Sequence, residues 1–87
     1  MKLEFARSLS GHDKNQVYLI LEKDERAAYL VNGKTHTLEK PKKKNKKHSQ
    51  IIKNIPEDIL AQFKKNGSLT DEIIYGMLRA YERSINK

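Results

Sequence analysis

Cysteine is absent from this chain of 87 residues, and so is tryptophan. Without cysteine the protein has no disulfide framework and no thiolate metal site, which fits a reducing compartment. Long apolar runs are missing too: Val17 to Leu21 and Ala27 to Val31 fall far short of the roughly 20 residues of a membrane span. Residues 1–20 lack the positive start, apolar middle and cleavage site of a secretory signal. We therefore expect one small cytoplasmic domain that does not bind a membrane.

Negative charge is absent from one stretch of the chain. Residues 40–54, the basic segment, hold seven lysines and no acid, whereas basic and acidic residues balance at six each before it and five each after it. The net charge of +7 therefore belongs to this segment. Such a concentration attracts a polyanion, and nucleic acid is the first partner to consider. Two alternatives are a solvated loop without a partner and a nuclear localisation signal.

Hydrophobic spacing before the basic segment predicts strands. Short alternating segments place four of them at about residues 2–8, 16–22, 27–32 and 34–39. Asn32-Gly33 predicts a tight hairpin between the last two, because both residues tolerate the positive φ of a type I′ turn. Such a meander must curl to cover its apolar face, which predicts a small barrel.

After the lysines the spacing becomes helical. Residues 49–52 are expected to form a short closing strand, Pro56 to begin a helix, and Gly67 to end it. Thr70 is expected to cap a second helix, whose apolar stripe comprises Ile73, Ile74, Met77, Leu78, Tyr81 and Ile85. We interpret the stripe as core, with a groove for a partner helix as the alternative. The predicted organisation is a barrel with the basic segment at 1–54 and a helical extension packed on it at 55–87.

Several stretches resemble one family. Phe5-Ala6-Arg7-Ser8-Leu9-Ser10-Gly11-His12-Asp13-Lys14-Asn15 and the strand after it resemble a KOW motif, a short RNA-binding strand-loop-strand element. The continuation, at 29–34, 38–44, 47–48 and 69–73, is similar to bacterial KOW-domain proteins related to the large-subunit ribosomal protein fourteen of archaea and eukaryotes. Leu3 and Asn15 stand where that family usually has glycine, and His12 where it tends to have arginine. Asn15 is expected to keep the left-handed turn, because asparagine tolerates that conformation best after glycine.

The resemblance implies a mainly β fold with C-terminal helices, namely a small SH3-like barrel of KOW type that binds structured RNA. We expect the bound RNA to be ribosomal RNA and the protein to associate with the ribosome or its assembly. Ribosomal proteins are candidate further partners. Lysine suits phosphate contact without sequence readout, and the candidates in the basic segment are Lys40, Lys42, Lys43, Lys44, Lys46, Lys47 and His48. Candidates for reading RNA shape or an unpaired base are Arg7, Gly11, His12, Lys14, Lys34 and His36.

Each assignment has an alternative. The turn at 11–15 is equally interpreted as a plain hairpin connection in which His12 and Asp13 satisfy local backbone groups. Tyr18 and Tyr29 either stack on bases or pack with a wet hydroxyl. A different function is also open, in which the barrel is a protein-interaction adaptor whose lysines bind an acidic protein surface.

Catalytic and metal-binding patterns are weak. Ser8, Ser10, His12 and Asp13 include the residue types of a hydrolytic triad, but neighbours on one short turn cannot line up nucleophile, base and acid. The three histidines lie far apart in the sequence without cysteine partners, and no glycine-rich phosphate loop is present. We expect that the protein is not an enzyme, that it binds no cofactor, and that it is monomeric when free.

Overall fold

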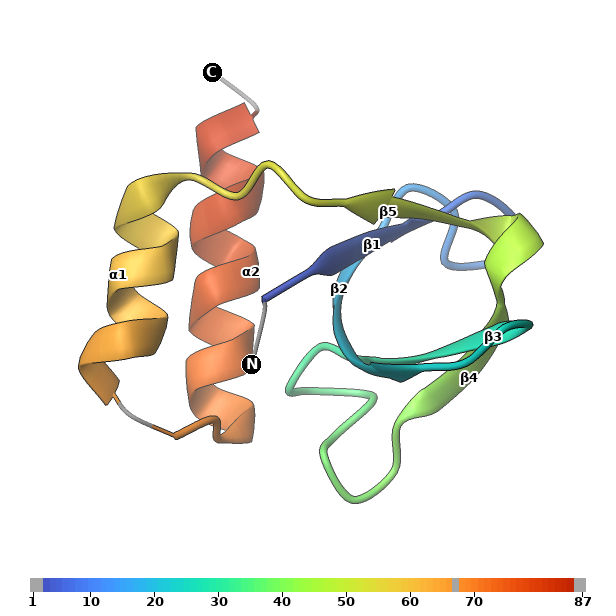
Figure 1. Cartoon of the computed structure of the whole chain (residues 1–87), viewed down its shortest axis with the longest axis horizontal. Coiled ribbons are helices and arrows are strands. Elements are labelled where there is room, and N and C mark those ends of the chain that lie inside the picture. The colour runs from blue at the N-terminus through green and yellow to red at the C-terminus, as the bar shows by residue number, and fades with distance from the viewer. Residues whose placement is uncertain (1–2, 67, 86–87) are drawn as a thin grey trace.

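The computed structural model describes residues 3–66 and 68–85, without the side chains of residues 63–66. Gly67, the expected end of the first helix, and Lys2, at the start of the first expected strand, lie outside the described residues. The chain is a mixed α+β protein, with a β sheet followed by two helices (Figure 1). The elements in order are β1 (Phe5–Ser8), β2 (Val17–Lys23), β3 (Ala27–Val31), β4 (Lys42–Asn45), the 3₁₀ turn η1 (Lys46–His48), β5 (Ser49–Ile52), α1 (Glu57–Asn66) and α2 (Asp71–Ile85).

The five strands form one antiparallel sheet in the order β4-β3-β2-β1-β5. Its register shifts between Ile20 and Glu22, and the sheet curls so that β1 and β5 lie opposite β3 and β4 (Figure 1). The turn η1 connects the two edge strands, β4 and β5, along the chain. Two hydrogen bonds tie it to the neighbouring turns: the Leu9 amide donates to the His48 carbonyl at 2.8 Å, and the Lys46 amide donates to the Arg26 carbonyl at 2.9 Å. As described, the sheet is curled but open, with β4 and β5 as its edges.

Alternation along the strands divides the buried residues between the two faces of the sheet. The inner, concave face carries Ala6, Tyr18, Ile20, Ala28 and Leu30. The outer face packs on the helices and contributes Phe5, Val17, Leu19 and Val31 to a core shared with Ile59, Ile74, Met77, Leu78 and Tyr81. The rings of Phe5 and Tyr81 meet edge to face, with centroids 5.2 Å apart. The interpretation of the α2 stripe as core is confirmed for its four buried members, whereas Ile85 is exposed.

The predicted helix starts are close to the observed ones. The Thr70 hydroxyl accepts from the Ile73 amide at 3.2 Å, so Thr70 caps α2 as expected. The Pro56 carbonyl accepts from the Ile59 and Leu60 amides, and α1 begins one residue later at Glu57. The strand expected at 49–52 is confirmed as β5, but it is an edge of the sheet and does not close it.

The predicted fourth strand at 34–39 and its tight hairpin are wrong. Residues 32–41 form a series of turns, and the lysine run itself supplies β4. The side-chain oxygen of Asn32 accepts from the amides of Lys34 and His36 at 3.0 and 2.9 Å, which satisfies these amides inside the loop. Gly33 has a φ of 79° and presses against the first turn of α2, where a Cβ would meet the Asp71 carbonyl oxygen. Docking of this loop on the helix therefore replaces the two-residue hairpin.

Candidate nucleic-acid interface

The lysines of β4 point alternately to the two faces of the sheet. Lys42 pairs with Leu30 and Lys44 with Ala28, so both side chains share the inner face with these buried residues. Lys43, between them, pairs with Tyr29 and is exposed. Half of the lysine strand thus faces the interior of the curled sheet, where an ammonium group requires a partner.

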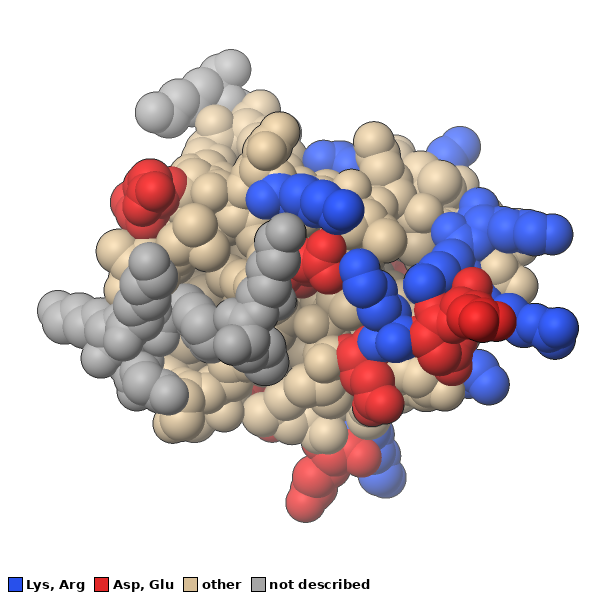
Figure 2. All heavy atoms as spheres, in the orientation of Figure 1, with Lys and Arg blue, Asp and Glu red and all other residues tan. Residues whose placement is uncertain are grey.

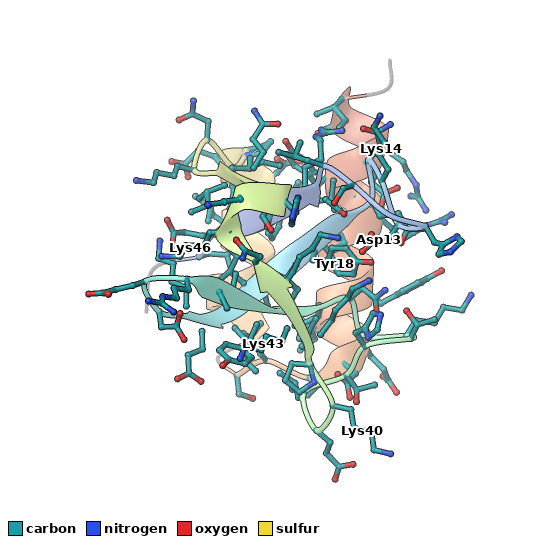
Figure 3. The ribbon with its side chains drawn as sticks, turned by 90° about the vertical axis from the view of Figure 1, so that its right-hand side faces the viewer. Asp13, Lys14, Tyr18, Lys40, Lys43 and Lys46 are labelled. Carbon is teal, nitrogen blue, oxygen red and sulfur yellow. The ribbon has the colours of Figure 1, made fainter. Side chains whose placement is uncertain are left out.

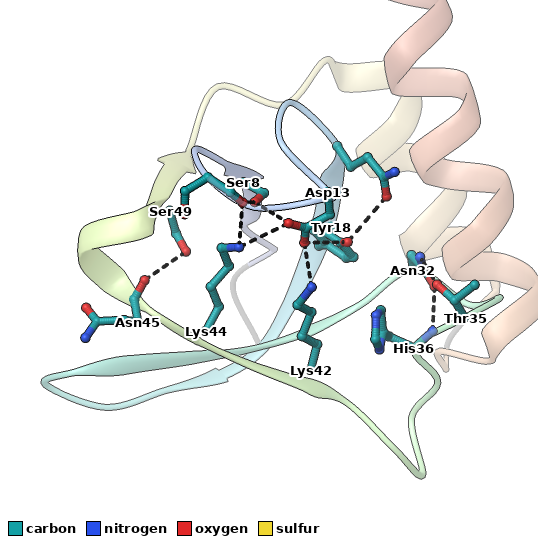
Figure 4. A network of polar contacts seen from close by, with 12 residues as sticks. Ser8, Asp13, Tyr18, Asn32, Thr35, His36, Lys42, Lys44, Asn45 and Ser49 are labelled. Carbon is teal, nitrogen blue, oxygen red and sulfur yellow. Dashed lines mark hydrogen bonds and ion pairs between the residues drawn. The ribbon is translucent and has the colours of Figure 1, made fainter.

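Asp13 is that partner (Figure 4). Its carboxylate accepts hydrogen bonds from Lys42 Nζ at 2.8 Å and Lys44 Nζ at 3.1 Å. It also accepts from the hydroxyls of Ser8 and Tyr18, each at 2.9 Å. Asp13 is 7% exposed, and its four side-chain donors come from three strands, β1, β2 and β4. We call these five residues the Asp13 network.

The network fixes the protonation state of its central group. Burial alone would raise the pKa of the Asp13 carboxyl, but the hydrogen bonds donated by Lys42, Tyr18, Ser8 and Lys44 outweigh it and hold that pKa well below its usual range. Burial, followed by the hydrogen bond to Asp13 and its charge, raises the pKa of Tyr18 well above its usual range. Asp13 is therefore an anion at neutral pH, and the protonated phenol of Tyr18 donates to it.

These contacts correct two interpretations made from the sequence. Asp13 does more than satisfy local backbone groups, because it joins residues 29 and 31 positions away in the chain. Tyr18 is 1% exposed and cannot present its ring to a base. Lys42 and Lys44 donate from their amines to Asp13, so their first role is structural: they hold β4 in place.

The outward cations of the basic segment form the solvent-facing part of the site. Lys40, Lys43, Lys47, His48 and Lys53 are exposed, and Lys46 is half-buried. Lys40, Lys43 and Lys46 follow β4 and its two ends on the side turned away from the helices (Figure 3). Basic side chains gather over the sheet at the right-hand end of the molecule, with acidic side chains among them (Figure 2).

One of the nearby acids is Asp24, in the turn between β2 and β3. Hydrogen bonds from the Ala27 and Arg26 amides, and then the charges of Lys43 and Lys46, lower the pKa of Asp24. Asp24 and Asp13 thus bring negative charge to a segment that has none in its own sequence. Asp13 and Asp24 therefore offset part of the positive charge of Lys42, Lys44, Lys43 and Lys46.

The turn at 11–15 presents its polar tip to solvent. Gly11 and Asn15 have φ angles of 85° and 73°, so the expectation that Asn15 keeps a left-handed turn is confirmed. The Asn15 amide donates to the Ser8 carbonyl at 2.8 Å, which closes the turn around Asp13. His12 and Lys14, at its tip, are both exposed.

The other predicted site residues lie in two further places. Arg7 is half-buried on β1, opposite Gln50 of β5. His36 is half-buried with its ring 6.1 Å from that of Tyr18, and Lys34 stands in the docked loop beside Tyr75 of α2. Sequence reasoning did not select Asp13, Tyr75 or Arg79. The one available signal was the Lys-x-Lys spacing of 42–44, which on a strand turns two cations to the same face.

No protein-family model matches the chain, and no curated protein is significantly similar to it. Within the described part of the chain, neither helix is long and apolar enough to cross a bilayer.

Proposed function

We propose that this protein binds structured RNA, with ribosomal RNA as the target, through the outward cations of the basic segment and the tip of the turn at 11–15. The observation that carries the proposal is the division of the lysines. The Asp13 network holds β4 rigidly by Lys42 and Lys44, while Lys40, Lys43, Lys47 and Lys53 remain exposed. Lys43 lies on this strand, whereas Lys40 precedes it, Lys47 lies in η1 and Lys53 follows β5. Exposed cations spread along a folded segment in this way are suited to contact a phosphate backbone.

The fold supports the same proposal. We interpret the curled five-stranded antiparallel sheet, whose edge strands are joined by η1, as an SH3-like barrel of KOW type. In this interpretation the loop at 9–15 and the turn η1 lie side by side, since Leu9 bonds to His48. They would dock together on the RNA, and the helices would cover the opposite side of the sheet.

The expected salt dependence follows from the number of available cations. If about four lysines each displace a counterion, affinity should fall roughly 50- to 150-fold between about 50 and 200 mM salt. This is less than the whole segment would give, because Lys42 and Lys44 are held by Asp13.

The test replaces Lys40, Lys43, Lys47 and Lys53 together by glutamine, and separately by arginine as a control that keeps the charge. Binding to purified ribosomal subunits, bare ribosomal RNA and transfer RNA is measured by filter binding over a range of salt. The glutamine variant should lose at least about tenfold in affinity and most of its salt dependence, whereas the arginine variant should retain both. Undiminished binding by the glutamine variant would contradict the proposal.

The same experiment distinguishes RNA binding from the adaptor alternative. The apolar surface of α2 that this alternative would use is largely buried in the core, because Ile74, Met77, Leu78 and Tyr81 are buried. What remains is an acidic protein surface as the ligand of the lysines. Failure of the wild-type protein to bind any RNA, together with binding to an acidic protein, would favour that alternative.

A further inference from the structure

Tyr75 differs from the large apolar side chains nearest to it on α2. It is 38% exposed, whereas Ile74, Met77, Leu78 and Tyr81 are all buried. Two cations flank it: Lys34 Nζ lies 6.0 Å from the ring centroid, and the guanidinium carbon of Arg79 lies 5.9 Å from it. Both distances are at the outer limit of cation–π contact, so neither cation is held tightly there.

Two hollows meet at this ring. One, of about 380 Å³, runs from Val17 across the docked loop to Leu78, Arg79 and Glu82 of α2. The other, of about 400 Å³, lies between Gly33 and Glu72. Lys34 and Tyr75 line both. Both hollows are open to solvent, so a planar group has room beside the ring.

The fold fixes the backbone on both sides of this site. Gly33 lies so close to α2 that a Cβ would be 2.9 Å from the Tyr75 amide nitrogen. The Leu38 amide donates to the Asp71 carboxylate at 2.9 Å, which ties the far end of the loop to the same turn of the helix. Asn32 bonds to the loop amides of Lys34 and His36. The backbone of Lys34 is therefore fixed next to Tyr75, and the residue is exposed.

We propose that Lys34, Tyr75 and Arg79, the Tyr75 site, bind one unpaired nucleotide of the RNA. The base stacks on the Tyr75 ring, and its phosphate lies between the two cations. Stacking on an exposed aromatic side chain is available only to a base that has left its helix. The Glu82 carboxylate, on the rim of the same hollow, can accept a hydrogen bond from an exocyclic amine or a 2′-hydroxyl.

This inference rests on the proposed function and adds selectivity to it. The cations of the basic segment attract any phosphate backbone, whether paired or not. The Tyr75 site favours RNA that contains an unpaired base, and its aromatic contribution is independent of salt. The two parts of the surface can therefore be separated by probe and by salt.

The experiment measures fluorescence anisotropy of two labelled probes with the full chain: a short oligoadenylate, and a blunt RNA duplex with the same number of phosphates. Tyr75→Ala should weaken binding to oligoadenylate about 5- to 100-fold and leave duplex binding within about twofold. The salt dependence for both probes should be unchanged, because no charge is removed. Tyr75→Phe should bind like the wild type.

Two further comparisons make the test specific. Arg79→Gln should weaken oligoadenylate binding more than Arg83→Gln, which removes the same charge from an exposed position one turn later on α2. Tyr75→Leu keeps an apolar side chain without a ring, so its contrast with Tyr75→Phe decides the question if Tyr75→Ala does not fold.

Equal losses for both probes, or no loss for oligoadenylate in Tyr75→Ala and Tyr75→Leu, would overturn the Tyr75 site while RNA binding by the lysines stands. If the wild-type chain binds neither probe, the proposed function and this site fail together.

Discussion

Lys42 and Lys44 differ from Lys43 only in their position along β4, yet the three lysines have different surroundings. Lys42 and Lys44 point to the inner face and share the carboxylate of Asp13, whereas Lys43 points to solvent. The twofold period of a strand separates them. A run of like charges is therefore not a uniform surface, because part of it belongs to the structure that holds the rest.

The comparison also separates two kinds of energy. The inner lysines gain from a buried carboxylate in surroundings where charge interactions are strong and a missing partner is costly. The outer ones interact through water and salt, so they contribute little to folding and remain available to a polyanion. Replacement of an inner residue should therefore change stability first, and replacement of an outer one RNA affinity first.

The largest expected effect comes from Asp13→Asn. This variant keeps the shape of the side chain and leaves two ammonium groups facing a neutral amide, so the free energy of unfolding should fall by about 3–5 kcal/mol. Urea denaturation followed by circular dichroism measures it. Asp24→Asn is the control, because the exposed Asp24 can still accept from the Arg26 and Ala27 amides as an asparagine and should change stability far less. Similar losses in the two variants would mean that the Asp13 network does not stabilise the fold.

A smaller effect should distinguish neighbouring lysines. Lys44→Met removes one donor to Asp13 and should cost about 1–3 kcal/mol of unfolding free energy, with RNA affinity at a given salt changed little. Lys43→Met removes an exposed charge, so stability should stay within about 0.5 kcal/mol of wild type while RNA affinity falls. Urea denaturation and filter binding on the same samples give both quantities. An opposite order of the two variants in either measurement would contradict the assignment of Lys44 to the inner face and Lys43 to the outer face of the sheet.

Acid should weaken the inner contacts selectively. The pKa of Asp13 is lowered in the folded protein, so its contribution to stability is present above the unfolded pKa of about 4 and is lost as the pH falls toward the folded pKa. Below about pH 4 this one group should lower the unfolding free energy by up to about 1.4 kcal/mol per pH unit. The difference in unfolding free energy between the wild type and Asp13→Asn should therefore become smaller as the pH falls. If this difference stays constant from pH 6 to pH 2, the pKa of Asp13 is not lowered.

The elements that were predictable from the sequence are those whose signals are local. Val17 to Leu21 alternates over a length typical of a strand, and Thr70 precedes acids and a helical stripe, so β2 and α2 fall close to their expected places. β4 escaped prediction because three lysines and an asparagine have little intrinsic preference for a strand. Its pairing with β3 and the charge of Asp13 decide its conformation, and neither is visible in the composition of 42–45 itself.

The misplaced hairpin has a similar origin. Asn32-Gly33 has the composition of a two-residue turn, but Gly33 uses its positive φ to approach α2, an element about 40 residues further on. Tyr75 was likewise part of no local motif. It becomes a candidate only when the loop brings Lys34 beside it, since composition and spacing do not reveal that contact.

The smallest expected effect concerns the turn that carries Asp13 to the inner lysines. Asn15 has a φ of 73° and bonds through its amide to Ser8, a member of the Asp13 network. In Asn15→Gly the easier left-handed conformation is offset by the greater freedom of glycine in the unfolded chain, so stability should change by no more than about 0.5 kcal/mol. Asn15→Ala, the matched control, should cost about 1–2 kcal/mol because alanine is strained there. If urea denaturation shows that both variants are neutral, the turn does not need its left-handed residue, and the side-chain bonds from Ser8, Tyr18, Lys42 and Lys44 suffice to hold Asp13 in place.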